Sequence, residues 1–208
     1  MSNKLSLKVL VLGDVAVGKS SLANRYVNQT FSFEYKVTIG ADFFLKQLQI
    51  GDNSITLQIW DTAGQERYDS FNRPFYRGAD CALIVYDITD PRTFANLDKW
   101  FENLIENVQN THSIDRRNIP IAIVGNRLDL HKLREVEYSK AELWCKRKQI
   151  NYFEVSAKTG ENVDTVFDYL VEECLSLDRQ LNKIPDFNIR YDNAVKLGKK
   201  RKLTSTCC

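Results

Sequence analysis

With 208 residues, the chain is long enough for one folded domain and a short extension. Its composition, 43% hydrophobic and 11% aromatic, excludes a chain that is disordered throughout. The formal net charge of +2 is unevenly placed: residues 183–208 hold seven basic and two acidic side chains, a net +5, which leaves −3 for the rest. A mildly acidic body with a basic tail argues against a nucleic-acid-binding domain and favours a tail that meets an anionic surface.

The N-terminal region predicts neither a secretion signal nor a membrane anchor. The apolar run at 9–12 is too short for the core of a signal peptide, and no stretch of the sequence approaches the roughly 18 apolar residues of a membrane span. Cys81, Cys145 and Cys174 lie singly in apolar stretches without a CxxC pair, which is typical of reduced thiols in a core. We therefore expect the folded body to lie in the cytosol.

Strand and helix patterns alternate along the chain. Runs of β-branched and aliphatic residues predict buried strands, and apolar residues at helical spacing predict helices. A turn cluster at 51–53 predicts a hairpin between its two flanking strands. The alternation indicates an α/β fold with a mostly parallel sheet, and the loss of periodicity after about residue 181 indicates a flexible tail. The predicted elements are strands at 7–12, 43–50, 55–59, 82–86, 119–124 and 152–155, and helices at 19–28, 94–108 and 163–174.

A phosphate-binding loop follows the first predicted strand and opens the first predicted helix. Gly13 and Gly18 let the backbone curl so that its N–H groups face phosphate oxygens, and the helix N-terminus favours the anion. Lys19 supplies a positive charge to the β- and γ-phosphates, and Ser20 offers a hydroxyl to Mg²⁺. This loop alone leaves an ATPase, a kinase and a GTPase open. The pattern G-x-x-x-x-G-K-[ST] is matched by Gly13-Asp14-Val15-Ala16-Val17-Gly18-Lys19-Ser20.

Three later motifs also lie beside predicted strands, and together they separate these classes. An aspartate at a strand end, here Asp61, can hold Mg²⁺ through water. Asp129 can accept both donors of a guanine edge, a pairing that adenine does not offer; a P-loop kinase or ATPase should lack Asp129 and the motif at 156–158. In this order the motifs resemble the Ras superfamily of small GTPases, and the resemblance covers residues 7 to about 181. The motifs are Asp61-Thr62-Ala63-Gly64-Gln65-Glu66, Gly125-Asn126-Arg127-Leu128-Asp129 and Ser156-Ala157-Lys158.

This resemblance implies a P-loop small G domain at 1–182, with a six-stranded mixed sheet, helices on both faces and one antiparallel edge strand, followed by a basic tail at 183–208. It implies that the protein binds GTP or GDP with Mg²⁺ and hydrolyses GTP slowly. The catalytic residues would be Gln65, which orients the attacking water, and Lys19, which contacts the phosphates.

The same resemblance assigns the ligands of the ion and the nucleotide. Ser20 and Thr38 would hold Mg²⁺ directly and Asp61 through water, while Phe31 would pack against the base and the backbone of Gly64 would bind the γ-phosphate. The nucleotide-binding residues that it implies are Gly13, Val15, Ala16, Val17, Gly18, Lys19, Ser20, Ser21, Phe31, Tyr35, Thr38, Gly64, Asn126, Arg127, Asp129, Ser156, Ala157 and Lys158.

Within the superfamily the sequence is most similar to the Rab branch. Phe43, Trp60 and Phe75 match the aromatic triad that Rab proteins present to effectors; the alternative is that they belong to the ordinary core. The body also resembles the late-endosomal and lysosomal Rab proteins, and the Rab segments disfavour Rho or Ras proper. The Rab-like segments are Ile39-Gly40-Ala41-Asp42-Phe43, Leu57-Gln58-Ile59-Trp60, Arg67-Tyr68-Asp69-Ser70, Phe75-Tyr76-Arg77-Gly78-Ala79 and Ile84-Val85-Tyr86-Asp87-Ile88-Thr89.

The tail ends in Cys207 and Cys208, which match the cysteine pair that Rab proteins carry for geranylgeranyl groups. The pair differs from a C-a-a-X end, and two lipid chains anchor stably where one binds reversibly. The basic cluster at 199–202 can reach anionic headgroups. Taken alone, it would better suit a solvated tail or a nuclear localisation signal, and the terminal cysteines favour the membrane.

The resemblance further implies a monomer in vesicle trafficking, with no nucleic-acid partner. Its expected partners are effectors, an exchange factor, a GTPase-activating protein, a prenylation escort and a GDP-dissociation inhibitor. We expect a cytoplasmic protein that lies reversibly on the cytosolic face of endosomal and lysosomal membranes.

Two residues depart from the family pattern. Arg127 replaces the lysine of N-K-x-D, and its planar, bulkier guanidinium is not a neutral exchange, so we predict weaker or faster-exchanging nucleotide. Val15 stands beside the γ-phosphate position, where bulky residues slow hydrolysis in Ras-like proteins. We predict that Val15 crowds Gln65 and lowers intrinsic turnover, which leaves a GTP-bound scaffold with little hydrolysis as an alternative.

Overall fold

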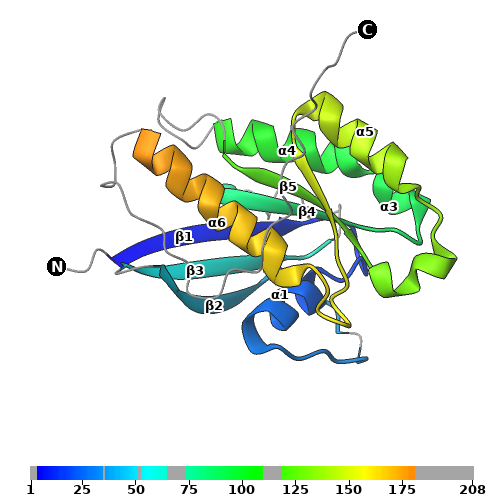
Figure 1. Ribbon diagram of the computed structural model, residues 1–208, viewed down its shortest axis with the longest axis horizontal. Coiled ribbons are helices and arrows are strands. Elements are labelled where there is room, and N and C mark those ends of the chain that lie inside the picture. Colours follow the sequence, from blue (N-terminus) through cyan, green and yellow to red (C-terminus); the bar gives the residue numbers. More distant parts are fainter. Residues whose placement is uncertain (1–3, 35, 51–52, 65–73, 110–118, 181–208) are drawn as a thin grey trace, which may run out of the picture.

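The computed structural model describes residues 4–34, 36–50, 53–64, 74–109 and 119–180. In this part of the chain, six strands form one sheet in the order β2-β3-β1-β4-β5-β6 (Figure 1). β2 is antiparallel to β3, and the other neighbouring pairs are parallel, which confirms the predicted mixed sheet with an antiparallel edge strand. The strands are β1 (Lys4–Leu12), β2 (Ala41–Ile50), β3 (Asn53–Thr62), β4 (Cys81–Asp87), β5 (Ile121–Asn126) and β6 (Asn151–Glu154).

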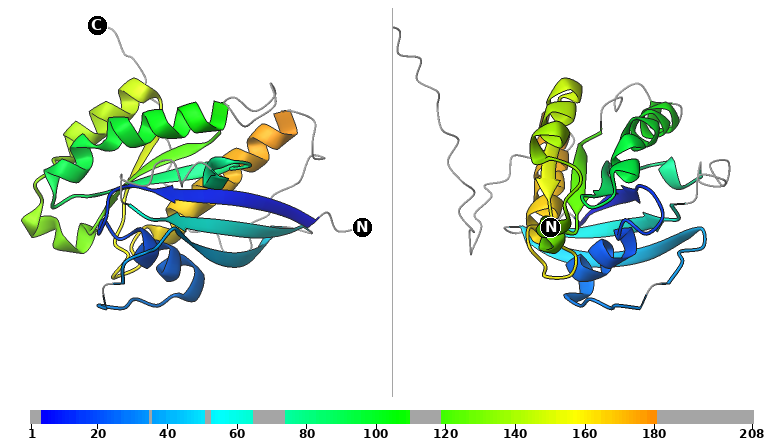
Figure 2. Two further views of the ribbon diagram at one scale, coloured as in Figure 1. Left: turned by 180° about the vertical axis from the view of Figure 1, so that it is seen from behind. Right: turned by 90° about the vertical axis from the view of Figure 1, so that its right-hand side faces the viewer.

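Helices cover both faces of this sheet. α1 and α6 pack on one face with a core that includes Leu22 and Phe167, and α3, α4 and α5 pack on the other with a core that includes Trp100 and Cys145. In Figure 1 α6 lies in front of the sheet, and in the left view of Figure 2, from behind, α4 lies in front of it. The helices are α1 (Lys19–Asn28), α3 (Pro91–Ala95), α4 (Leu97–Gln109), α5 (Tyr138–Lys148) and α6 (Val163–Gln180), with a 3₁₀ helix, η2, at Leu128–Leu133.

The central strand β1 contributes to both cores, because successive side chains of a strand point to opposite faces. Leu7, Val9 and Val11 join the core under α1 and α6, whereas Leu10 and Leu12 join the core under α4. A strand covered on both faces needs apolar residues at every position, which is why the run is continuous rather than alternating.

The helix predicted at 94–108 is divided in the structure. Asp90 caps α3 by accepting a hydrogen bond from the backbone N–H of Arg92, and Pro91 occupies the first turn, where its missing N–H costs little. Asn96 ends α3, and α4 begins at the next residue. The apolar spacing continues across this junction, so the sequence pattern predicted a single helix. The structure has two, because the C-cap at Asn96 ends the first.

The predicted core thiols are confirmed, since Cys81, Cys145 and Cys174 are buried and free. None of the helices in the described ranges combines the length and hydropathy needed to cross a membrane.

The parallel strands β1, β3, β4, β5 and β6 all end at the same edge of the sheet. Leu12 lies beside Ile84, Asp87 beside Asn126, and Gly125 beside Glu154, so the loops that follow these strands are neighbours. Crevices at the carboxyl ends of parallel strands are the usual ligand sites of α/β sheets. The predicted motifs at 13–20, 61–64, 125–129 and 156–158 therefore meet at one place.

Candidate nucleotide site

A cavity of about 700 Å³ opens at this edge of the sheet. Its lining comes from the phosphate loop, α1, the segment before β2 with the start of β2, and the loops after β3, β5 and β6, segments that are far apart in the sequence. The predicted site residues that line it are Val15, Ala16, Gly18, Lys19, Ser20, Ser21, Phe31, Thr38, Gly64, Asn126, Arg127, Asp129, Ala157 and Lys158.

The two glycines of the phosphate loop are required by close contacts as well as by conformation. Gly13 has φ +135° and a Cβ there would lie 2.1 Å from the carbonyl oxygen of Val85. Gly18 has φ +93° and a Cβ there would lie 2.3 Å from Nδ2 of Asn126. A larger residue at either position would displace the loop from β4 or from the guanine motif.

The side chain of Lys19 folds back along the phosphate loop. Its ammonium group donates to the carbonyl oxygens of Gly13 at 2.8 Å and Asp14 at 2.7 Å. Burial lowers the pKa of Lys19 to about 8, and the nearby carboxylates of Asp61 and Asp14 act in the opposite direction. A buried cation with few counter-charges is well suited to a phosphate group.

The three predicted Mg²⁺ residues converge although they come from three different segments. Oγ of Ser20 lies 2.9 Å from Oγ1 of Thr38, which lies 3.4 Å from Oδ2 of Asp61. Asp61 is fully buried and its Oδ1 has no hydrogen-bond partner among the described residues. Burial raises the pKa of Asp61 to about 6. Two hydroxyls beside a buried, unpaired carboxylate oxygen form the all-oxygen environment that Mg²⁺ prefers, so these residues fit the ion.

The guanine end of the cavity is held by side-chain hydrogen bonds. Asn126 donates through Nδ2 to the carbonyl oxygen of Val17 at 2.8 Å and accepts at Oδ1 from the N–H of Ala157 at 3.1 Å. Ser156 donates to Oδ1 of Asp129 at 2.7 Å, and Nζ of Lys158 lies 3.9 Å from Oδ2 of Asp129. The Asp129 carboxylate is thus fixed in direction before any base arrives.

Comparison with known proteins agrees with this geometry. Residues 8–176 match the family model described as Ras family. The chain belongs to the Ras family.

Similarity to individual relatives places it in the Rab branch. It is 46% identical to the Ras-related protein Rab7 of Drosophila melanogaster over 88% of this chain and 87% of the relative. It is 46% identical to Rab-7a of Dictyostelium discoideum over 84% and 85% of the two chains, and 48% identical to Rab7 of Prunus armeniaca over 83% and 84%. These relatives confirm the predicted late-endosomal type of Rab, a small GTPase of vesicle trafficking that binds and hydrolyses GTP.

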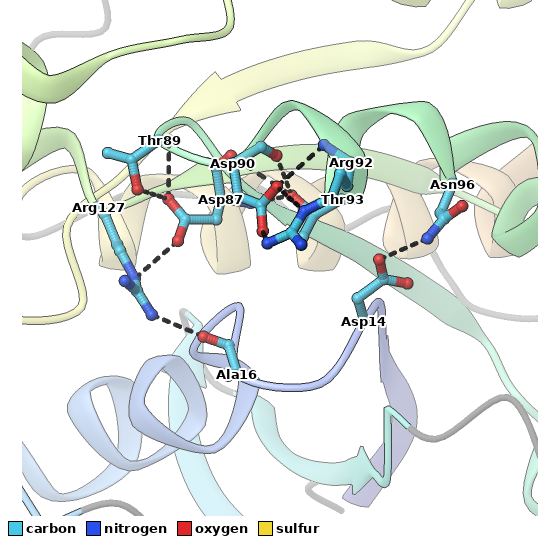
Figure 3. A network of polar contacts seen from close by, with 9 residues as sticks. All are labelled: Asp14, Ala16, Asp87, Thr89, Asp90, Arg92, Thr93, Asn96 and Arg127. Atoms are coloured by element: carbon cyan, nitrogen blue, oxygen red, sulfur yellow. Dashed lines mark hydrogen bonds and ion pairs between the residues drawn. The ribbon is translucent and has the colours of Figure 1, made fainter.

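In this Rab protein Arg127 still connects the guanine motif to the phosphate loop. Its Nη2 donates to the carbonyl oxygen of Ala16 at 2.7 Å, and its Nε lies 3.1 Å from Oδ2 of Asp87 (Figure 3). Asp87 is almost fully buried and its other carboxylate oxygen accepts from the N–H and hydroxyl of Thr89. Asp87, at the end of β4, belongs to a Rab-like segment but to none of the nucleotide-binding motifs, and its contact with Arg127 was not predicted from the sequence.

Some of the predicted residues support the cavity rather than line it. Gly13 and Val17 contribute carbonyl oxygens that hold Lys19 and Asn126, and Ser156 holds Asp129; none of the three lines the described cavity. Tyr35 and Gln65 lie outside the described residues, as do the tail at 183–208 and its Cys207 and Cys208.

Two residues that the motifs did not predict also reach the base end of the site. Arg25, on α1, donates from Nε to the carbonyl oxygen of Ala157 at 2.9 Å and from Nη2 to that of Lys158 at 2.5 Å. Phe33, which is 84% exposed, lies under the ammonium group of Lys158, 5.5 Å from the ring centre. Neither carries a motif signal, because an arginine within a helix and an aromatic residue in a loop are ordinary in most folds.

The predicted aromatic triad is a continuous cluster in this Rab protein. The rings of Phe43 and Trp60 meet edge to face at 5.2 Å, and those of Trp60 and Phe75 lie 5.8 Å apart. Nζ of Lys8 lies 4.4 Å over the Trp60 ring and donates to the carbonyl oxygen of Arg77 at 2.9 Å. Phe43 is 48% exposed while Trp60 also packs against the core, so the cluster is partly core and partly surface.

Proposed function

We propose that the cavity holds GTP or GDP in one defined orientation. The base lies at Asn126 and Asp129, and the phosphates lie at Lys19 and the phosphate loop. The observation that carries this assignment is that one cavity joins a buried lysine at one end to a carboxylate fixed by Ser156 and Lys158 at the other. Asp129 accepts both donors of the guanine edge, and an adenine offers this largely buried carboxylate no matching pair of donors, which is a strong basis for discrimination.

In this proposal three residues act on the terminal phosphate and the attacking water when GTP is hydrolysed to GDP and phosphate. Gln65 orients the attacking water, Lys19 stabilises the charge on the phosphate oxygens, and the N–H of Gly64 binds the γ-phosphate. Ser20 and Thr38 would hold Mg²⁺ directly and Asp61 through water, and the bound ion would neutralise charge on the β- and γ-phosphates.

The purpose of the reaction is a change of conformation. Thr38 and Gly64 lie in the switch segments at 31–43 and 64–78, and their contacts to the γ-phosphate side exist in the GTP state alone. Loss of these contacts on hydrolysis releases both segments and the effectors that bind them. We propose that effectors bind Phe43, Trp60 and Phe75 in the GTP state. An exchange factor would reload GTP, and a GTPase-activating protein would accelerate its hydrolysis.

Residues 1–182 form the G domain of this proposal, and residues 183–208 form a membrane-directed tail. Geranylgeranyl groups on Cys207 and Cys208, made with a prenylation escort, would provide the anchor, and the basic cluster would add attraction to anionic headgroups. A GDP-dissociation inhibitor would carry the GDP form through the cytoplasm between endosomal and lysosomal membranes. The similarity to Rab7 proteins supports this location.

A second candidate is a GTP-bound scaffold with little turnover. Val15 lines the cavity and is 41% exposed, so its side chain occupies space on the phosphate side.

One measurement separates the two candidates. The untagged protein is purified and denatured, and the released nucleotide is identified by ion-pair chromatography. Mostly GDP supports the cycling switch, and mostly GTP supports the scaffold. An adenine nucleotide would contradict the assignment of the base site.

A further inference from the structure

Asp14, in the phosphate loop, directs its carboxylate away from the nucleotide cavity and toward α4. Its Oδ2 accepts from Nδ2 of Asn96 and its Oδ1 accepts from Nε1 of Trp100, both at 2.7 Å. The contact to Asn96 is visible in Figure 3, where the Asp14 side chain points at the junction of α3 and α4. Asp14 is not among the residues that line the described cavity.

The two donors form a matched pair for this carboxylate. Asn96 immediately precedes α4 and Trp100 follows four residues later, so both side chains lie on the same side of the helix start. The backbone N–H of Trp100 donates to the carbonyl oxygen of Asn96, which fixes their spacing. Trp100 is 2% exposed, so its indole N–H is protected from water. Hydrogen bonds to a charged acceptor in such a place are stronger than neutral ones.

The backbone of Asp14 carries contacts to the proposed catalytic groups. Its carbonyl oxygen accepts from Nζ of Lys19. Gly64 packs directly on the peptide between Asp14 and Val15, since a Cβ on Gly64 would lie 2.4 Å from the N atom of Val15. Any movement of this peptide therefore moves Val15 and displaces Gly64.

We propose that the carboxylate of Asp14, held by Asn96 and Trp100, is a brace that sets the position of the Asp14–Val15 peptide opposite the γ-phosphate. Asp14 is a positioning residue for GTP hydrolysis, acting through Gly64 and Lys19. This inference rests on the roles proposed above for those two residues.

A reciprocal exchange tests the brace. Asp14→Asn keeps the shape of the side chain but removes the negative charge that both donors now meet, because the Asn96 amide can turn its oxygen toward the new N–H₂. Asn96→Asp brings two carboxylates together. The double variant Asp14→Asn/Asn96→Asp restores a charge-assisted hydrogen bond between positions 14 and 96 with donor and acceptor exchanged, while Trp100 still donates to the amide oxygen of residue 14. Aspartate remains a favourable residue at a helix N-terminus. Trp100→Phe removes the other donor, and it carries the test if the variants at 14 do not fold.

The matched control is Trp144→Phe, which removes an indole N–H bonded to Asp98 at 3.2 Å on the outer side of α4. Single-turnover GTP hydrolysis, release of fluorescent GDP and the thermal midpoint are measured for each variant. We expect Asp14→Asn and Trp100→Phe each to slow hydrolysis by about fivefold. The double variant should return to within about twofold of the parent, and Trp144→Phe should hydrolyse GTP as the parent does.

Two results would overturn the brace while leaving the proposed function intact. One is parental hydrolysis in Asp14→Asn and Trp100→Phe with a lower thermal midpoint alone, which is the result of a purely structural role. The other is a double variant as slow as the product of its two single effects. A parent that does not hydrolyse GTP contradicts the proposed cycle itself, and the role of the brace in hydrolysis with it.

Discussion

Val15 is the residue of the phosphate loop that combines cavity lining with a bulky, 41% exposed side chain. Gly64 packs on the backbone N atom of Val15, so the Val15 side chain leaves the loop close to the residue proposed to bind the γ-phosphate. We expect Val15→Ser and Val15→Gly to hydrolyse GTP faster than the parent by about tenfold, which is about 1.4 kcal/mol of activation free energy. Single-turnover hydrolysis measures this, and equal rates in parent and variants would refute the crowding of Gln65.

At position 127 the guanidinium is divided between two partners, the carbonyl oxygen of Ala16 and the carboxylate of Asp87. Part of the Arg127 guanidinium is directed to Asp87 rather than to the phosphate loop and the base. A lysine would lie along the base without this division, so we expect Arg127→Lys to slow GDP release by about threefold. Arg127→Met loses both partners and should release GDP faster than the parent. Release of fluorescent GDP into excess unlabelled GTP gives both rates. An unchanged rate for Arg127→Lys would contradict the proposed weakening by arginine.

At the scale of elements, β6 is joined to the segment before α5 by a partly buried ion pair. Nη1 and Nη2 of Arg134 donate to Oε1 and Oε2 of Glu154, each at 2.6 Å, and the side chains are 17% and 9% exposed. Tyr152 donates to the same carboxylate, and its hydroxyl also meets that of Tyr86. Removing the carboxylate would leave a largely buried cation and a hydroxyl without their acceptor.

We therefore expect Glu154→Ala to lower the free energy of unfolding by about 3 kcal/mol. The matched control is Glu142→Ala, which breaks an exposed pair with Lys146 within α5 and should cost about 0.5 kcal/mol or less. Urea denaturation followed by circular dichroism measures both changes. Equal losses for the two variants would show that burial does not distinguish these ion pairs.

The elements also show which structural information lies in local sequence. Apolar patterns predicted each of the six strands. Continuous apolar runs mark β4 and β5, which are covered on both faces, whereas β2 alternates between more and less buried residues as an edge strand does. The same reasoning placed the start of β1 three residues late and joined α3 to α4. Lys4 to Ser6 pair with β3 despite their polar residues, and the break at Asn96 depends on capping contacts rather than on periodicity.

At the scale of the whole molecule, the fold removes three thiols from solvent. Burial raises the pKa of Cys145 to about 12, and a hydrogen bond with Cys174 together with burial raises that of Cys81. Neither of these thiolates is populated at pH 8, and the Cys174 side chain is only 4% exposed. We therefore expect the variant Cys207→Ser/Cys208→Ser to be inert to a thiol-disulfide reagent at that pH. In denaturant all three remaining thiols should react. Rapid reaction of the native variant would contradict the burial of these cysteines.

The residues of the candidate site also fall into two groups, those that local sequence motifs predict and those that depend on contacts between distant parts of the chain. The motifs located Lys19, Asn126 and Asp129 because each motif is a short segment with its own chemistry. The partners of Asp14 lie 82 and 86 residues away in the chain, and those of Arg25 lie 132 and 133 residues away. Contacts at such separations are produced by the packing of α1 and α4 on the sheet, so no local pattern predicts them.

The central place of β1 has a consequence for the order of folding. Val9 pairs with Ile59 on one side and with Cys81 on the other, strands that follow it by 50 and 72 residues. The strand that leads into the phosphate loop is thus made before both of its partner strands and pairs with them late. Closing such distant pairs is slow compared with forming helices, and the guanine motif arrives later still, with β5 and β6. Tight binding of a guanine nucleotide would accordingly become possible only at the last stage of folding, after most of the domain has been synthesised.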